Sequence, residues 1–433
     1  MSKEKSMNFQ KETEELFAFI DQSPTAFQAT QNLGKMAEKA GFQELKEAEE
    51  WKLTRGRSYY VKRNDSSIAA FTIPDKEAEE IKGFHMIAAH SDSPSFKIKE
   101  NAQMTVEGQY VRLNTEKYGG MILSTWFDRP LSVAGRICIE ENGQVVSRLV
   151  NVDRDLCVIP NVAIHMNREL NKGVEYNPQV DLLPLYGEAA EEKNFADMIA
   201  EYAGVKRNDI LSYDLFLYVR QKGTVIGSKG EYILSPRLDD LQCAYSAMRA
   251  MTSEKPGDYI NLCLVFDNEE VGSGTRQGAD STFLADVLAR IRGAFGKTES
   301  WLQAKIADSF LLSADNAHAL HPNHPEKADP TNRPFLNNGV VIKFHGGQKY
   351  TTDAVSAAYV KLLCKKAKVP VQIYTNRSDI AGGSTLGNIS TSHVSVPSAD
   401  IGLPQLAMHS AVETAGIKDT AYAVALMREF YKQ

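Results

Sequence analysis

The chain has 433 residues, of which 43% are hydrophobic and 24% are charged, and its formal net charge is −6. Such a length predicts more than one hydrophobic core, most simply a large domain that carries a smaller one, and the chain lacks the apolar run of roughly 18 residues that a membrane span needs. The acidic balance argues against a nucleic-acid partner, because phosphate binding needs a basic face.

The N-terminal part of the chain predicts two helices followed by the start of a sheet. Its first residues are polar and lack the apolar core of a signal peptide, which predicts a cytoplasmic protein. Apolar residues then recur at helical spacing between Leu16 and Met36, interrupted by Ser23 and Pro24. Three short β-rich runs follow, SYYVKR, SIAAFTI and FHMIAAH, and the last of them ends at His90.

The middle of the chain differs from both ends in its predicted secondary structure. Residues 95–234 consist of shorter strands and turns, and Asn142-Gly143 in RICIEENGQVVSRLV is a strong signal for a two-residue hairpin. After Ser235 helical and strand-like segments alternate as far as VPVQIYT, which predicts βαβ units and a mostly parallel sheet. We therefore expect an α/β domain built from residues 1–94 and 235–433, with a β-rich domain inserted at 95–234.

Residues that commonly bind metals stand at the ends of apolar runs along the whole chain. They are His90, Asp239, Glu269, Glu270, Asp315 and His409. A buried parallel strand delivers ligands from its carboxyl end, so this pattern favours a two-metal hydrolase. Asp92, two residues after the first histidine, can accept the imidazole N–H that does not face a metal. Taken alone, that HSDS motif is equally typical of a core histidine beside a loop.

The strongest single motif is DNEEVGSG, where three acids follow the apolar run LCLVF. Burying them together is costly unless a cation or a water-filled cleft stabilises them. Of two neighbouring glutamates, one can bind metal while the other takes a proton from the attacking water. Asp239 in SPRLDD can supply a bridging carboxylate, although helix capping alone also explains that motif. Carboxylate and histidine ligands suit zinc, manganese or cobalt.

Other catalytic motifs are weaker. The glycines after DNEE lack the lysine of a phosphate loop, and GSTLGN lacks the spacing of a serine-hydrolase elbow. The five cysteines are widely spaced without a CxxC pair, which favours buried free thiols in a reducing compartment over a nucleophile. His318, His321 and His324 could form a surface metal tract, but prolines break the helix such a tract needs, and we expect only His318 to face a site.

Five segments in this order, AAHSDSPSFKIK, SPRLDD, DNEEVGS, SADNAHALHPN and PQLAMHS, resemble the M18 family of aspartyl aminopeptidases, and the resemblance runs along the whole chain. It implies two divalent metal ions per subunit, most simply zinc. The implied ligands are His90 and Asp315 for one ion, Glu270 and His409 for the second, and Asp239 as the bridge between them.

The resemblance also implies roles outside the ligand set. Glu269 is expected to be the general base, and a cis peptide is expected between Asp239 and Asp240. The inserted β-rich region is expected to be a dimerisation domain, with dimers assembling into a tetrahedral dodecamer. His165 in PNVAIHMNREL matches a histidine that reaches a neighbouring subunit's site, although from the residues alone it is equally well a strand residue.

Substrate preference in the family is for an N-terminal Asp or Glu, which requires a cation. Lys343 and Tyr350 in GVVIKFHGGQKY fall where relatives keep a lysine and a tyrosine, so both are expected to contact substrate, together with His318. We therefore expect a metallo-aminopeptidase acting on acidic N-terminal residues of peptides. The alternatives are a dinuclear aminopeptidase of neutral or broad specificity, a deacylase of the same wider group, and a non-catalytic oligomeric scaffold, which has no use for Glu269.

Overall fold

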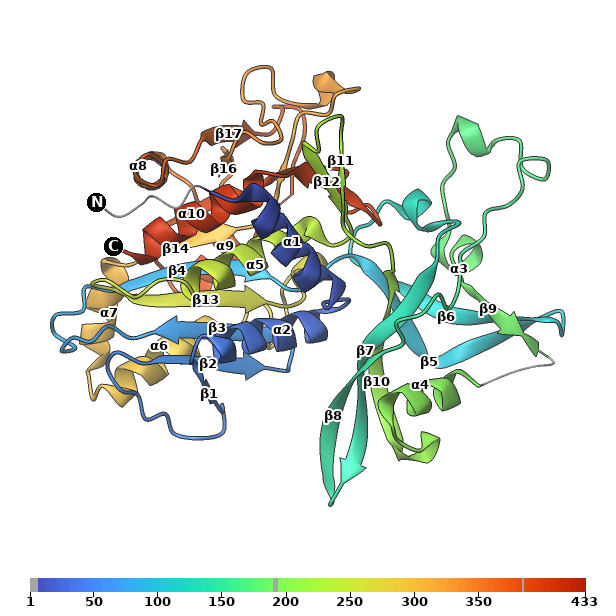
Figure 1. The fold of residues 1–433 in the computed structure, drawn as a ribbon, viewed down its shortest axis with the longest axis horizontal. Coiled ribbons are helices and arrows are strands. Elements are labelled where there is room, and N and C mark those ends of the chain that lie inside the picture. Colours follow the sequence, from blue (N-terminus) through green and yellow to red (C-terminus); the bar gives the residue numbers. More distant parts are fainter. Residues whose placement is uncertain (1–6, 190–193, 384) are drawn as a thin grey trace. The chain divides into compact units, whose positions relative to one another are not determined.

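The structure is a computed structural model that describes residues 7–189, 194–383 and 385–433 (Figure 1). Contacts divide the chain into two compact units. The first comprises Met1–Asp92, Gly223–Met408 and Glu413–Gln433, and the second comprises Ser93–Lys222 and His409–Val412. Residues 223–234, which sequence analysis assigned to the insert, group with the first unit because a strand at Tyr232–Ser235 pairs with one at Glu413–Gly416.

The first unit is built around a mixed, mostly parallel sheet. In spatial order its strands are β1 (Gln43–Leu45), β2 (Ser58–Arg63), β3 (Ser67–Thr72), β13 (Ile260–Phe266), β4 (Phe84–His90), β14 (Phe310–Ala314), β18 (Ser398–Gly402), β16 (Val340–Phe344) and β17 (Val371–Thr375). The neighbours β13, β4, β14 and β18 run parallel, whereas β3 and β16 pair antiparallel with β13 and β18. The predicted α/β architecture is therefore confirmed, and the carboxyl ends of β13, β4 and β14 lie at one edge.

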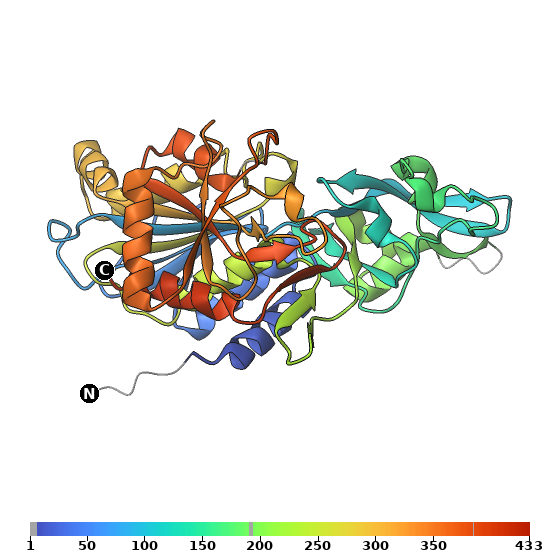
Figure 2. The same cartoon turned by 90° about the horizontal axis from the view of Figure 1, so that it is seen from above.

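Helices cover both faces of this sheet (Figures 1 and 2). They are α1 (Phe9–Asp21), α2 (Ala26–Lys39), α5 (Leu238–Met251), α6 (Phe283–Ala294), α7 (Glu299–Ala307), α8 (Ala354–Ala367), α9 (Leu386–His393) and α10 (Asp419–Tyr431). The two helices predicted before the sheet are thus confirmed. Because both faces are covered, every residue of β4 and of β13 is buried, which explains why these strands read as continuous apolar runs.

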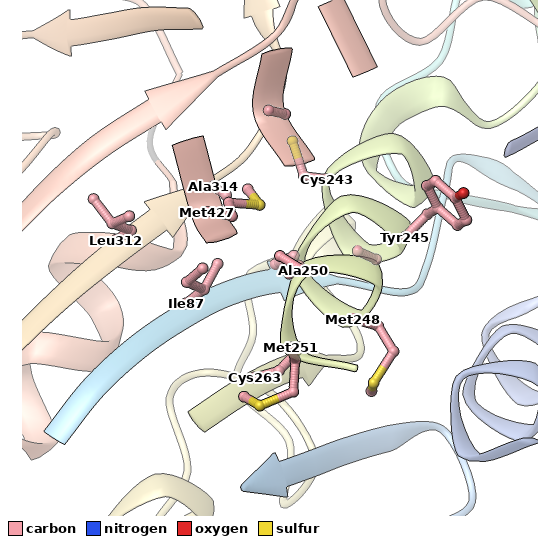
Figure 3. Close-up of a cluster of buried hydrophobic side chains, with 14 of the residues drawn as sticks. Ile87, Cys243, Tyr245, Met248, Ala250, Met251, Cys263, Leu312, Ala314 and Met427 are labelled. Carbon is pink, nitrogen blue, oxygen red and sulfur yellow. The ribbon is translucent and has the colours of Figure 1, made fainter. Parts of the chain in front are cut away.

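Two hydrophobic cores lie on the two faces. On one face α1, α2, α5, α8 and α10 pack against the sheet, and Figure 3 shows Met251 of α5 beside Cys263 of β13. On the other face α6, α7 and α9 pack against residues such as Leu262 and Leu311. The cysteines are free thiols, and all but Cys138 are buried, as predicted.

A smaller sheet completes the first unit. Its strands are β11 (Thr224–Ile226), β12 (Tyr232–Ser235), β20 (Glu413–Gly416), β19 (Pro404–Leu406) and β15 (Ala317–His318). β15 pairs with β19, and this pairing fixes the position of the segment that follows β14. No helix in the described ranges combines the length and the apolarity that crossing a membrane requires.

The second unit is built on an antiparallel sheet. Its strands in spatial order are β8 (Gln144–Asn151), β7 (Leu131–Glu141), β10 (Ile210–Val219), β5 (Ser95–Val106), β6 (Tyr110–Tyr118) and β9 (Leu185–Glu188), and its helices are α3 (Pro178–Asp181) and α4 (Phe195–Ala203). The predicted hairpin is confirmed, because Glu141 pairs with Gln144 and both turn residues, Asn142 and Gly143, have positive φ.

Candidate metal centre

His90 ends β4 and is only 1% exposed. Its Nδ1 lies 3.1 Å from the carbonyl oxygen of Asp92 and 3.4 Å from the Oδ1 of the same residue. Its Nε2 lies 3.6 Å from Asp239 Oδ1 and 4.0 Å from Glu269 Oε2. A proton on Nδ1 therefore has acceptors in Asp92, and Nε2 faces the acids with its lone pair available to a metal.

Asp92 also fixes the loop that follows β13. Its Oδ1 accepts a hydrogen bond of 3.1 Å from the backbone N–H of Glu269, and its Oδ2 accepts one of 3.2 Å from that of Glu270. These two amides begin a short 3₁₀ turn, Glu269–Val271, after Asn268 with a φ of 61°. One buried aspartate therefore orients the histidine and both glutamates. The HSDS motif predicted only its contact with the histidine.

The two acids of SPRLDD lie in the first turn of α5. The peptide between Asp239 and Asp240 is cis, as the resemblance implied. Asp240 Oδ2 accepts a hydrogen bond of 3.2 Å from the backbone N–H of His90. The backbone N–H of Asp239 donates to Glu413 Oε2 at 3.0 Å, and this buried glutamate was not singled out from the sequence. The sequence feature that could have revealed it is that it is the one charged residue of the segment SAVETAG.

Asp315 directly follows β14 and lies beside a buried lysine. Lys343 Nζ is 3.6 Å from Asp315 Oδ1 and donates to the carbonyl oxygen of Asn316 at 2.7 Å, and it lies 5.6 Å from the centre of the Tyr350 ring. Asn316 Nδ2 donates to the carbonyl oxygen of Leu238 at 2.9 Å, which ties the end of β14 to the start of α5. This asparagine was not predicted from the sequence. The only feature that could have pointed to it is its position directly after Asp315.

Potential ligand atoms lie within 4.8 Å of one another in two overlapping groups of the first unit, His90 with Asp239, Asp240 and Asp315, and His90 with Glu269 and Glu270. Burial raises the pKa of Glu270 well above its usual value, and the charge of Asp239 raises it further. Burial also raises the pKa of Glu269 to about 7. Crowded carboxylates whose charge is disfavoured in this way fit a divalent cation, and one imidazole among carboxylates is a donor set typical of zinc.

The remaining predicted residues are placed as follows. His409 lies in the short segment that belongs to the second unit, where its Nδ1 hydrogen-bonds the carbonyl oxygen of Gly120. His165 lies in an exposed turn of the second unit and not in a strand. His318 is exposed in β15, with its ring centre 5.9 Å from that of Tyr374. These positions do not test the predicted roles, so metal binding by His409 and substrate contact by His165 and His318 stay predictions.

Comparisons with known proteins agree with this geometry. The model of the family "Aminopeptidase I zinc metalloprotease (M18)" matches residues 19–431. "Probable M18 family aminopeptidase 2" from Clostridium novyi (strain NT) is 48% identical over 424 residues, which cover 96% of this chain and 98% of the relative.

Solved structures are similar over nearly the whole chain. A chain in the structure of the Ape4 and Nbr1 complex has a TM-score of 0.94 at 36% identity, covering 98% of this chain and 86% of that one. A chain of the S. cerevisiae mApe1 dodecamer has a TM-score of 0.85 at 28% identity, covering 98% and 97%. This protein therefore belongs to the M18 family of zinc metallo-aminopeptidases and is a metal-dependent hydrolase.

Proposed function

We propose that the enzyme removes Asp or Glu from the N terminus of peptides. The observation that carries this proposal is a buried cation, since Lys343 is 3% exposed beside Asp315 and Tyr350. Burial by itself lowers the pKa of Lys343, but the negative charge of Asp315 raises the pKa above its usual value, so the ammonium group stays charged. Its donors can pair with an acidic substrate side chain.

The proposed metal ligands are His90 and Asp315 for one ion, Glu270 and His409 for the other, and Asp239 for both. When bound, divalent ions at such a site polarise the scissile carbonyl and make the attacking water more acidic. Glu269 then accepts a proton from that water and passes it to the leaving amine. Asp92 holds the Glu269 backbone in place for both transfers.

We also propose self-assembly. The similar S. cerevisiae mApe1 forms a dodecamer, and the second unit of this chain exposes apolar side chains at Val162 (49%), Ile164 (45%) and Met166 (82%). Burying such side chains between subunits would stabilise association, and we propose the dimers and tetrahedral dodecamer that the family resemblance implies. His165, in the same segment, would then reach a neighbouring subunit's site. The cytoplasmic location stays a prediction.

The proposed specificity is tested by hydrolysis of Asp-, Glu- and Leu-p-nitroanilide. The protein is first stripped of metal and then refilled separately with zinc, manganese and cobalt. Activity confined to the acidic substrates, and lost in Lys343→Met but kept in the exposed-lysine control Lys361→Met, supports the proposal. Activity on Leu alone would overturn the acidic preference while leaving the metallo-aminopeptidase assignment intact.

A further inference from the structure

Asp400 is a fully buried carboxylate in β18 that the mechanism above does not use. Its Oδ2 accepts hydrogen bonds from the backbone N–H of Thr351 at 2.6 Å and from the Thr351 hydroxyl at 2.9 Å, and its Oδ1 accepts one from the Thr385 hydroxyl. Its backbone N–H donates to the Thr352 hydroxyl at 2.8 Å. One residue thus joins residues 351–352 to residue 385, which precedes α9: its carboxylate bonds Thr351 and Thr385, and its backbone N–H bonds Thr352.

The strand register places Asp400 next to the proposed specificity lysine. β16 and β18 pair antiparallel with Ile342 opposite Ile401, so the next step of the register sets Lys343 opposite Asp400. Directly opposed side chains of an antiparallel pair lie on the same face of the sheet. On the other side of β18, Ser313 of β14 pairs with Asp400, and it lies two residues before Asp315, which follows β14. Asp400 is therefore between the strands that carry the proposed ligand Asp315 and the proposed cation.

The segment that contains Tyr350 is held by a second set of contacts. Lys349 Nζ donates to the carbonyl oxygens of Ala381 at 3.2 Å and Gly382 at 3.0 Å. At Gly387 in α9, a Cβ atom would lie 2.7 Å from Asp400 Oδ1, so the helix approaches the carboxylate closely only because this residue is glycine. Residues 349–352 are consequently fixed to Ala381 and Gly382 through the Lys349 side chain, and to Thr385 through the buried carboxylate.

We propose that Asp400 is a positioning residue that sets the preference for the first side chain of the substrate. The inference rests on the proposed function, in which Lys343 and Tyr350 contact that side chain. Asp400 fixes Thr351, and through it the neighbouring tyrosine, relative to the lysine on the adjacent strand. Without this anchor the segment gains freedom, and the enzyme loses discrimination between side chains more than it loses catalytic power.

The test compares Asp400→Asn and Thr385→Val with Thr385→Ser, which keeps the hydroxyl. Asp419→Asn is the matched control, because Asp419 is another buried carboxylate, bonded to the backbone N–H groups of Asn337 and Gly339. The readout is the ratio of kcat/KM between the best and the worst of the Asp, Glu and Leu p-nitroanilides on zinc-loaded enzyme.

We expect Asp400→Asn and Thr385→Val to lower this ratio by about tenfold, mainly through KM. Thr385→Ser should keep the wild-type ratio, and Asp419→Asn should lower only the melting temperature. An unchanged ratio in both Asp400→Asn and Thr385→Val, with a fall in melting temperature like that of Asp419→Asn, would show a purely structural role and overturn the inference.

The two proposals fail separately. If the wild type prefers Leu, the acidic specificity is wrong, but the best-to-worst ratio still reports on Asp400. In that case a reduced ratio in the variants supports the positioning role, and an unchanged ratio overturns it. If Asp400→Asn does not fold, the pair Thr385→Val and Thr385→Ser decides by the same criterion, because this pair leaves the buried carboxylate in place.

Discussion

Glu269 is the residue whose chemistry can be separated from metal binding. It is partly exposed, its backbone is fixed by Asp92, and its carboxylate faces His90 from 4.0 Å. Replacement by glutamine keeps the shape and removes the base. We expect Glu269→Gln to lower kcat by about 10²–10⁴-fold with unchanged zinc content, measured by steady-state kinetics and metal analysis. The control is Glu326→Gln on the surface, and near-normal turnover in Glu269→Gln would contradict the role.

His85, at the start of β4, makes the stability of the fold depend on pH. Its ring stacks between Tyr259 and Phe430, with ring centres 3.7 and 4.4 Å away. Burial lowers its pKa to about 3. Because the folded-state pKa lies below the unfolded one, the neutral ring's contribution is complete above pH 6.5 and is lost as the pH falls toward 3.

Urea unfolding of the wild type and of His85→Phe at pH 8 and pH 5 tests this linkage. We expect the wild type to lose about 1 kcal/mol per pH unit below roughly pH 6 from this group. The phenylalanine variant keeps the stacking and lacks the titration, so its free energy of unfolding should fall less. Equal losses in both proteins would show that His85 is not the source of the acid sensitivity.

The sequence singled out those candidate site residues whose type and position at a strand end were informative by themselves. His90 ends a strand, and Asp315 and the two glutamates follow strands, that were predicted from apolar runs. Asn316 and Glu413 could not be found in this way, because their partners Leu238 and Asp239 are distant in the chain. A buried amide that joins a strand end to the start of a helix has no local pattern, so only the fold reveals it.

At the scale of elements, strongly apolar or strongly periodic segments were predicted well. β2 and β4 coincide with the predicted segments SYYVKR and FHMIAAH. By contrast, α7 and β18 were not predicted. Most of α7 is not buried, so its sequence ESWLQAKIA shows little periodicity, and β18 reads SADIG because a glycine and a buried acid replace apolar residues. That acid is Asp400, so the local pattern is weak at a position with a proposed role.

The central strands should contribute most to the stability of the first unit. Leu312 in β14 is fully buried in the core on the α5 face. We expect Leu312→Ala to lower the free energy of unfolding by about 3 kcal/mol, because the cavity cannot collapse between a sheet and its covering helices. Val371→Ala on the edge strand β17, where the side chain is 37% exposed, is the control and should cost under about 1 kcal/mol. Urea denaturation measures both, and equal losses would contradict the argument.

For the whole molecule, metal and stability should be linked. His90 and the carboxylates come from elements that are about 150 to 225 residues apart in the chain, on the two sides of the second unit, so the site exists only in the folded protein. Zinc at about a thousandfold above its Kd should stabilise the fold by roughly 4 kcal/mol. We expect chelation to lower the melting temperature and zinc to restore it, as measured by differential scanning calorimetry.

Two variants test whether this link runs through the proposed ligands. Asp315→Asn should lose most of the zinc-dependent rise in melting temperature, because its side chain is a weaker metal ligand. Glu269→Gln should retain the rise, since Glu269 is not among the proposed ligands. An undiminished zinc effect in Asp315→Asn would show that zinc stabilises the protein from another place.

The position of β4 in the sheet has a consequence for synthesis of the protein. Its two neighbours are β13 and β14, and Asp240, which bonds the His90 backbone, comes 150 residues after that histidine. At roughly 5–20 residues per second, the ribosome leaves this buried strand without either neighbour for on the order of ten seconds. A nascent chain with such an unpaired apolar strand is a natural client for chaperones. The same delay means that a polypeptide still on the ribosome cannot act as a peptidase until most of its own length has been made.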